Sequence, residues 1–300
     1  MTDSHLLNSA PAIALLPYNL KVTPKLGQRS LDELAWPLGR PERLSHGRIS
    51  DMEETDHLLT YISSRLLYMP RPGVRAKVSV MLLEPKAIHG RNMAWLRLLW
   101  WRFFVVLTCN PSLLGAIPNG VRFLFGSTWV PDWAETDMSK TRMLSLIAST
   151  KEHLEGHRLR HRTVDWLKAN AIDAEILGLG YAPFERKSDG LAPYRYSVII
   201  ENVQETSYFT EKLVDCLLCE TVPIYWGAPD IDEIFDTRGM LVCNSFEDIQ
   251  AAVKSISEAD YQSRLEFIAK NKEKASLYAH TDRAAARIVH IAAQRKNPKP

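Results

Sequence analysis

The sequence predicts an α/β protein with two domains, each built around parallel strands. A chain of 300 residues is about twice the commonest domain size. Short apolar runs rich in β-branched residues alternate with helical segments in both halves, and this order favours parallel pairing with crossover helices. A polar stretch without periodicity, at 131–140, separates the halves, so we predict domains over 1–138 and 139–300. Two such domains facing each other predict a ligand cleft between them.

In the first domain, the predicted strands end at prolines. Residues up to Ser50 are irregular and contain many Pro and Gly residues, so no element is assigned there. Apolar spacing predicts a helix over 51–67, and the run AKVSVMLL predicts a strand over 76–83 that stops at Glu84-Pro85. Further along we predict a helix around 95–103, a strand over 103–109 that ends at Asn110-Pro111, and a strand over 121–125.

The second domain repeats this alternation and ends in helices. Its predicted elements are, in chain order, a strand from Arg142, a helix over 158–168, strands over 174–177 and 196–200, a helix over 210–219, a strand over 222–225, a helix opened by Asp230, and a strand over 240–243. Ser245 to Asp248 has the form of a capping box, and Thr281 is a candidate helix cap. We therefore assign the terminal helices to this domain.

Composition and charge exclude several classes of protein. The apolar fraction of 46% and the charged fraction of 24% are those of a folded globular chain. A net charge of +2 is far below the basic excess of most nucleic-acid binders, so nucleic acid is not expected as a partner. Four cysteines give no disulfide framework, and the first twenty residues lack the positive start of a secretory signal. These features predict a cytoplasmic protein and leave peripheral attachment to a membrane open.

Candidate binding residues cluster where two elements of the second domain end. Glu201 and Asn202 follow the strand over 196–200 directly, and the carboxyl ends of strands face the ligand in α/β sheets. Thr210-Glu211-Lys212 opens the next helix, whose free N–H groups favour an anion. We therefore take these five residues as candidates for binding an anionic ligand.

Three sequence blocks in this region resemble a known family. The blocks are Tyr196 to Asn202, Tyr208-Phe209-Thr210-Glu211-Lys212-Leu213, and Val222-Pro223-Ile224-Tyr225-Trp226-Gly227. In order and spacing they are similar to the signatures of the α1,3/1,4-fucosyltransferases, which form glycosyltransferase family 10. The close similarity covers about forty residues and extends weakly back to Ser149, whereas the first half shows no convincing similarity.

The resemblance implies a GT-B architecture, in which two Rossmann-like domains face each other across a cleft. It also implies inverting transfer of fucose from GDP-fucose to a carbohydrate acceptor, without a required metal or other cofactor. Asn202, Tyr208, Glu211 and Lys212 would bind the nucleotide sugar. The family's diphosphate-binding arginine is assigned to Arg160, with Arg158 as the second choice.

An inverting transfer also needs a base that takes the proton of the acceptor hydroxyl. The family places a catalytic Glu in a Glu-Ser-Pro context after a strand of the N-terminal domain. Glu84 precedes Pro85 at the end of the strand over 76–83, although the Ser is absent here. We therefore predict Glu84 as the base, with Glu135, Asp132 and Asp137 as the alternatives.

Two other patterns suggest a metal, and we interpret both as structural. His153, His157 and His161 are spaced for one helix face, but no Cys or carboxylate cluster completes a site, and Gly156 weakens the helix. Asp230-Ile231-Asp232 spells the acidic triplet of metal-dependent glycosyltransferases, yet it stands at a predicted helix start, where acids cap. We interpret it as a cap first and as an acceptor contact second.

Other functions remain open from the sequence. A glycosyltransferase of the same fold could use another nucleotide-sugar donor. A noncatalytic sugar-nucleotide sensor would keep the same donor residues. A polyanion-binding protein would instead use the arginine run over 158–162.

Overall fold

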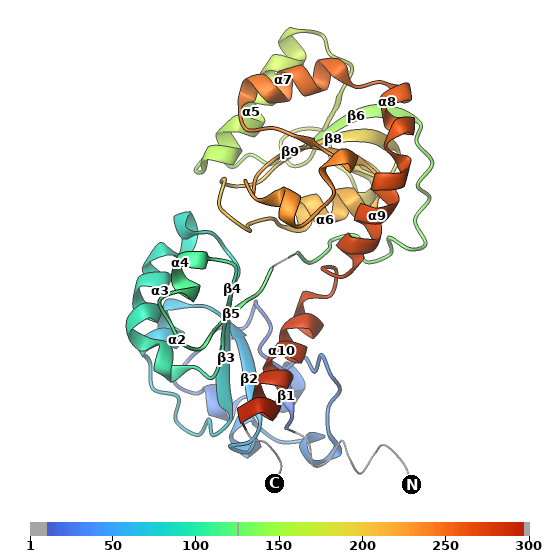
Figure 1. The fold of residues 1–300 in the computed structure, drawn as a ribbon. Helices are drawn as coiled ribbons and strands as arrows, with labels where there is room; N and C mark the ends of the chain where they lie inside the picture. Colours follow the sequence, from blue (N-terminus) through green and yellow to red (C-terminus); the bar gives the residue numbers. More distant parts are fainter. Residues whose placement is uncertain (1–10, 125, 297–300) are drawn as a thin grey trace. The chain divides into compact units, whose positions relative to one another are not determined.

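The chain forms two compact units, each with a five-stranded parallel sheet (Figure 1). The computed structural model describes residues 11–124 and 126–296. The first unit comprises 1–123 and 281–300, and the second comprises 124–280. Every strand pair within the two sheets is parallel, so the predicted α/β class with parallel sheets is confirmed.

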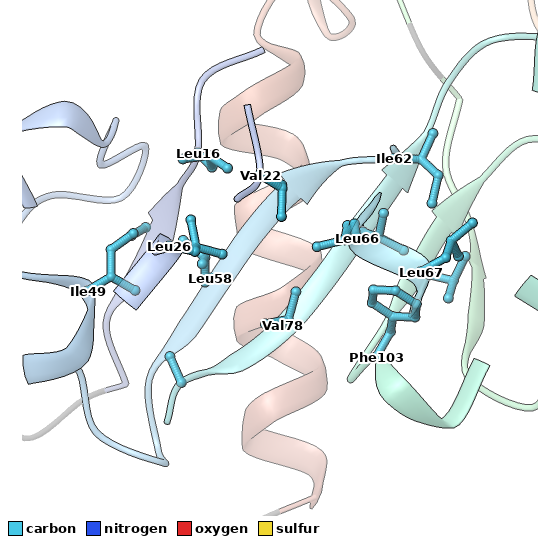
Figure 2. Packing of buried hydrophobic residues seen from close by; sticks show 14 of the residues in the cluster. Leu16, Val22, Leu26, Ile49, Leu58, Ile62, Leu66, Leu67, Val78 and Phe103 are labelled. Carbon is cyan, nitrogen blue, oxygen red and sulfur yellow. The ribbon is translucent and has the colours of Figure 1, made fainter. Parts of the chain in front are cut away.

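In the first unit the strands lie in sequence order, β1-β2-β3-β4-β5. The strands are β1 (Ile13–Leu15), β2 (His57–Tyr61), β3 (Lys77–Leu82), β4 (Val106–Thr108) and β5 (Gly120–Arg122), and the α-helices are α2 (Ser64–Tyr68), α3 (Lys86–Leu99), α4 (Pro111–Leu114) and α10 (Thr281–Lys296). Figure 2 shows part of the hydrophobic core, in which Leu58 and Val78 of neighbouring strands lie in one cluster with Leu66 and Leu67 of α2. Because β2 and β3 are parallel neighbours, their carboxyl ends lie at the same edge of the sheet.

The helix predicted over 51–67 is wrong, because β2 occupies the middle of that segment and only α2 is helical. Leu58, Leu59, Ile62 and Leu66 are spaced like one helix face, but β2 is buried on both faces. A strand buried on both faces loses the alternation that distinguishes it from a helix. The helix predicted around 95–103 begins earlier, at Lys86, and β5 is shorter than the strand predicted over 121–125, whose Phe125 lies outside the described residues.

The second unit has the strand order β10-β9-β8-β6-β7, with helices on both faces. Its strands are β6 (Arg142–Ile147), β7 (Glu175–Leu177), β8 (Tyr194–Ile200), β9 (Val222–Trp226) and β10 (Leu241–Val242), and its α-helices are α5 (Glu155–Ala169), α6 (Glu211–Leu218), α7 (Phe246–Ser255), α8 (Glu258–Ser263) and α9 (Leu265–Ser276). Ile199 packs with α6 and α9 on one face, whereas Val198 and Ile200 pack with α5 and α7 on the other. Alternate residues of one strand thus serve two cores, as in doubly wound folds.

The division between the units differs from the predicted one in two respects. The first unit ends at Phe123, before the polar stretch over 131–140 that we took as the boundary at 138. The last helix, α10, belongs to the first unit, where it packs against β1, and not with the other C-terminal helices. Its small buried residues, among them Ala285 and Ala286, allow this close approach. Local sequence gave no indication of which sheet this helix would cover.

Two further predictions concern single features. The four cysteines are buried and free, as expected for a chain without a disulfide framework. The predicted capping box is confirmed, because the Ser245 hydroxyl accepts from the Asp248 N–H at the start of α7. Among the helices in the described part of the chain, none has the length and apolar character needed to cross a bilayer.

Candidate functional site

The candidate residues lie at the carboxyl end of β8, beside the point where the strand order of the second sheet reverses. β6 pairs with β7 on one side and with β8 on the other, and ligands of doubly wound sheets bind at such switch points. The first turn of α5 lies directly against this edge, since the Gly156 N–H donates to the Asn202 carbonyl at 2.9 Å. A Cβ atom at position 156 would lie 1.7 Å from the Glu201 carbonyl oxygen. Only glycine therefore permits this approach.

Arg160 connects α5 to the end of β8. Its Nε donates to the Ile200 carbonyl at 3.1 Å, and its Nη2 donates to Asn202 Oδ1 at 2.9 Å. The Asn202 amide in turn donates to the Tyr208 hydroxyl at 3.4 Å. The structure thus joins three of the predicted donor-binding residues in one chain of hydrogen bonds.

Glu201 and Thr210 form the buried inner part of the site. The Glu201 side chain is fully buried, and its two oxygens accept from the Thr210 N–H and hydroxyl, both at 2.8 Å. Lys212 Nζ lies 3.6 Å from Glu201 Oε2 and donates to Thr210 Oγ1 at 3.0 Å. These contacts hold the start of α6 against the end of β8.

Lys212 and Glu211 form the more accessible part of the site. The exposed fractions of their side chains are 24% and 13%, and Lys212 Nζ lies 3.2 Å from Glu211 Oε1. Burial alone would lower the pKa of Lys212, but the Glu201 and Glu211 carboxylates outweigh it and raise that pKa. Burial would raise the pKa of Glu211, but Lys212 and Lys187 outweigh it and lower that pKa. Both side chains are therefore charged at neutral pH.

Two residues that the sequence did not single out support this pair. Lys187 Nζ lies 2.8 Å from Asp215 Oδ2 and 4.0 Å from Glu211 Oε1. The fully buried Asp215 carboxylate also accepts from the Thr128 hydroxyl at 2.5 Å and from the Trp129 N–H at 3.1 Å. The three segments that meet here are far apart in sequence, so no local pattern could have predicted their contact.

The His157 ring is kept neutral mainly by burial and secondly by neighbouring positive charges. Burial, followed by the charges of Arg160 and Lys151, lowers the pKa of His157 to about 4. The ring is therefore neutral at pH 7, and its Nδ1 lies 3.3 Å from the Leu154 N–H, from which it can accept.

The structure does not join Arg158 to these residues. Its guanidinium donates to the His153 carbonyl at 3.1 Å and is exposed, whereas Arg160 is only 6% exposed. Arg162 lies over the Phe246 ring at 3.9 Å and 3.6 Å from the Glu247 carboxylate. The three arginines thus point to different surroundings, and the basic surface required for polyanion binding is not formed by this run.

The three histidines that are spaced four residues apart, His153, His157 and His161, do not share one helix face. α5 begins at Glu155, so His153 precedes the helix. His161 Nδ1 lies 2.8 Å from the Tyr181 hydroxyl. Within the described residues, no group of three His, Cys, Asp or Glu side chains is arranged to hold a metal ion.

Glu84 lies in the first unit, between β3 and α3, and is half-buried. The alternative bases lie in the second unit, where Asp132 Oδ2 is 3.8 Å from Arg186 Nη1 and Glu135 is exposed. Hydrogen bonds from the Ser139 hydroxyl and N–H lower the pKa of Asp137. A lower pKa makes a carboxylate a weaker base, so Asp137 is the least suited of the three.

Asp230 does not cap a helix, so that prediction is wrong. It precedes a single 3₁₀ turn, Ile231–Glu233, and its carboxylate instead accepts from Ser207, from the N–H at 2.6 Å and from the hydroxyl at 2.7 Å. Ser207 has a φ of +60°, a left-handed conformation that a non-glycine residue adopts at a cost of about 1–3 kcal/mol. Asp230 thus holds the loop that carries the adjacent Tyr208.

If this cluster binds the GDP-sugar that the sequence resemblance implies, Asp230→Ala should weaken GDP binding by about tenfold, because charge-assisted hydrogen bonds of about 1.5–3 kcal/mol each no longer hold Ser207. Adding Ser207→Gly should recover part of the loss, since glycine adopts positive φ without a Cβ penalty. Asp232→Ala is the matched control from the same acidic triplet, because Asp232 is exposed. Calorimetric titration with GDP measures the effect. Equal affinities for the Asp230 and Asp232 variants would contradict the assigned role.

Comparison with known proteins places this geometry in a fold class. The pneumococcal O-GlcNAc transferase GtfA, solved with UDP and GlcNAc, is 11% identical, with a TM-score of 0.51 over 81% of this chain and 57% of that chain. HepE of Anabaena, solved with UDP-glucose, is 12% identical, with a TM-score of 0.52 over 80% of this chain and 79% of that chain. Together with the two parallel α/β units, these similarities define the fold as GT-B, the two-domain architecture of glycosyltransferases.

The second unit also matches a sequence family. Residues 138–281, a little under half of the chain, match the sequence model of the glycosyltransferase family 10 (fucosyltransferase) C-terminal domain. This region is therefore a family 10 domain, and it contains the whole cluster around Arg160 and Lys212. The α-(1,3)-fucosyltransferase FucT of Helicobacter pylori is 32% identical over 78 residues, which are 26% of this chain and 16% of that enzyme.

Proposed function

We propose that the chain is an inverting glycosyltransferase that moves fucose, or a related deoxyhexose, from a GDP-sugar to a hydroxyl of a glycan acceptor. The observation that carries this proposal is the cluster of Arg160, Asn202, Glu201 and Lys212 at the switch point of a family 10 domain. Arg160 and Lys212 would stabilise the charge that develops on the leaving diphosphate. Glu211 would accept hydrogen bonds from donor hydroxyls, and Glu84 of the first unit would deprotonate the acceptor.

This function predicts that GDP and GDP-fucose raise the melting temperature of the protein, because a ligand that binds only the folded state stabilises it. At a hundredfold excess over the dissociation constant, the gain is about 2.7 kcal/mol. Thermal melting with GDP, UDP and GDP-fucose measures the donor preference. A shift with UDP alone would indicate another donor. A GDP shift without turnover of labelled GDP-fucose against a glycan panel would indicate a sensor.

We further propose that the reaction requires no metal, because two cationic side chains lie where a diphosphate would bind. We therefore expect turnover to persist in excess EDTA, with at most modest stimulation by magnesium. The measurement is release of GDP from GDP-fucose before and after dialysis against chelator. If turnover is lost completely in EDTA and restored by manganese, the reaction requires a metal. Asp230 and Asp232 would then be the candidate metal ligands.

A further inference from the structure

A groove of about 390 Å³ opens at the carboxyl edge of the first sheet. It is lined by residues 16–18 and 20–22, which follow β1, and by residues 61–65, which end β2 and begin α2. β1 and β2 are parallel neighbours, so the groove lies where ligands of open α/β sheets bind. Its volume is within the range of small-molecule sites, about 300–1,000 Å³.

Two tyrosines form one wall of this groove. The Tyr61 hydroxyl donates to Asp282 Oδ1 at 2.9 Å, which fixes that ring against α10. Tyr18 stands edge-on to Tyr61, with ring centroids 5.3 Å apart, and is 82% exposed. An exposed ring supported by a fixed one offers a flat apolar surface with a polar rim. Such a surface suits the C–H face and the hydroxyls of a sugar ring.

The charged groups that line the groove are both cationic. Lys21 and Arg65 line it, and no carboxylate does. Across the described ranges 11–124 and 126–296, neither side chain takes part in an ion pair. Both are exposed, so they keep their charges available to a ligand. The groove therefore combines an aromatic wall with positive charge, and an acidic carbohydrate complements both.

We propose that this groove is the acceptor subsite and that the acceptor is a glycan with an acidic group, a carboxylate, sulfate or phosphate, within reach of Lys21 and Arg65. The inference rests on the proposed transferase function. It agrees with the placement of Glu84, because β3 is the parallel neighbour of β2 and ends at the same edge. Neighbouring strands are about 5 Å apart, so an acceptor that spans a few sugar units from the groove reaches the end of β3.

The test uses the full chain on an array of neutral, uronic-acid, sulfated and phosphorylated glycans, with and without GDP. We expect acidic glycans to bind at least tenfold more strongly than their neutral counterparts, and the array identifies which acidic group is preferred. Tyr18→Ala should lower all glycan binding by about tenfold. The double variant Lys21→Ser and Arg65→Ser should remove the preference for acidic glycans. All variants should keep the melting shift with GDP.

Matched control variants lie outside the groove in the same unit. Tyr68→Ala removes another exposed tyrosine, and Lys25→Ser with Arg91→Ser removes two other exposed cations. These changes should leave glycan binding unchanged. Equal effects of groove and control variants, or no glycan binding with or without GDP, would overturn the proposal. If GDP did not raise the melting temperature of the unmodified chain, the proposed transferase function would be contradicted. Glycan binding would still test whether the groove binds acidic glycans.

Discussion

Replacing Lys212 or Arg160 by alanine should lower turnover of GDP-fucose by about ten- to a thousandfold. A charge-assisted contact with a phosphate contributes about 1.5–3 kcal/mol, and more when charge develops in the transition state. Steady-state kinetics with varied GDP-fucose measures the loss. Arg160 is buried and donates to the Ile200 carbonyl, and Lys212 faces the buried Glu201 carboxylate, so both variants should also melt at lower temperature. Kinetics are therefore measured well below that temperature.

Arg162→Ala is the matched control for Arg160→Ala. Arg162 lies on the same helix, α5, but its side chain is 61% exposed and faces Glu247. Its loss should leave turnover within about twofold of the unmodified chain, because surface ion pairs are worth about 0–1 kcal/mol. Lys212→Arg keeps the charge and should retain more activity than Lys212→Ala. If Lys212→Ala had the same donor affinity and turnover rate as the unmodified chain, Lys212 would not bind the donor.

Glu84→Gln should lower turnover by about a hundredfold or more and leave GDP binding intact. General-base catalysis contributes about a hundred- to ten-thousandfold, and glutamine keeps the shape of the side chain without its basicity. The donor residues all belong to the second unit, whereas Glu84 belongs to the first. Calorimetric titration with GDP and steady-state turnover on the same variant separate the two functions.

The alternative carboxylates provide the comparison for this variant. Glu135→Gln and Asp132→Asn change exposed groups of the second unit and should leave turnover unchanged. Retained turnover in Glu84→Gln, with loss in one of these variants, would move the base to the second unit. Loss of GDP binding in Glu84→Gln would show that the change reaches the donor site and that its effect on turnover is indirect.

The fold could be predicted where strands and helices have distinct periods. The runs that form β3, β8 and β9 are short and contain several β-branched residues, and β6 is a short run of mostly apolar residues, so the sequence predicts all four strands. β1 was not, because Ile13–Leu15 is too short to show a period and lies among prolines. β2 was taken for a helix because burial on both faces removes the alternation.

The site could be predicted where its residues lie next to an element end. Glu201 and Lys212 stand directly after a strand and at a helix start, so their convergence follows from the topology of a parallel sheet. Lys187, Asp215 and the contact between Ser207 and Asp230 could not be found in this way. They join segments that are separated in sequence, and the positive φ of Ser207 is not typical of its residue type.

The return of α10 to the first unit affects the order in which the protein folds as the ribosome makes it. Domains usually complete in the order of synthesis. Here the first sheet is translated early, but the helix that packs against β1 leaves the ribosome only after all of Leu124–His280. Until then the apolar surface that Ala285, Ala286 and Val289 cover stays open to water or to a chaperone. The unit that is synthesised first is therefore the last to be completed.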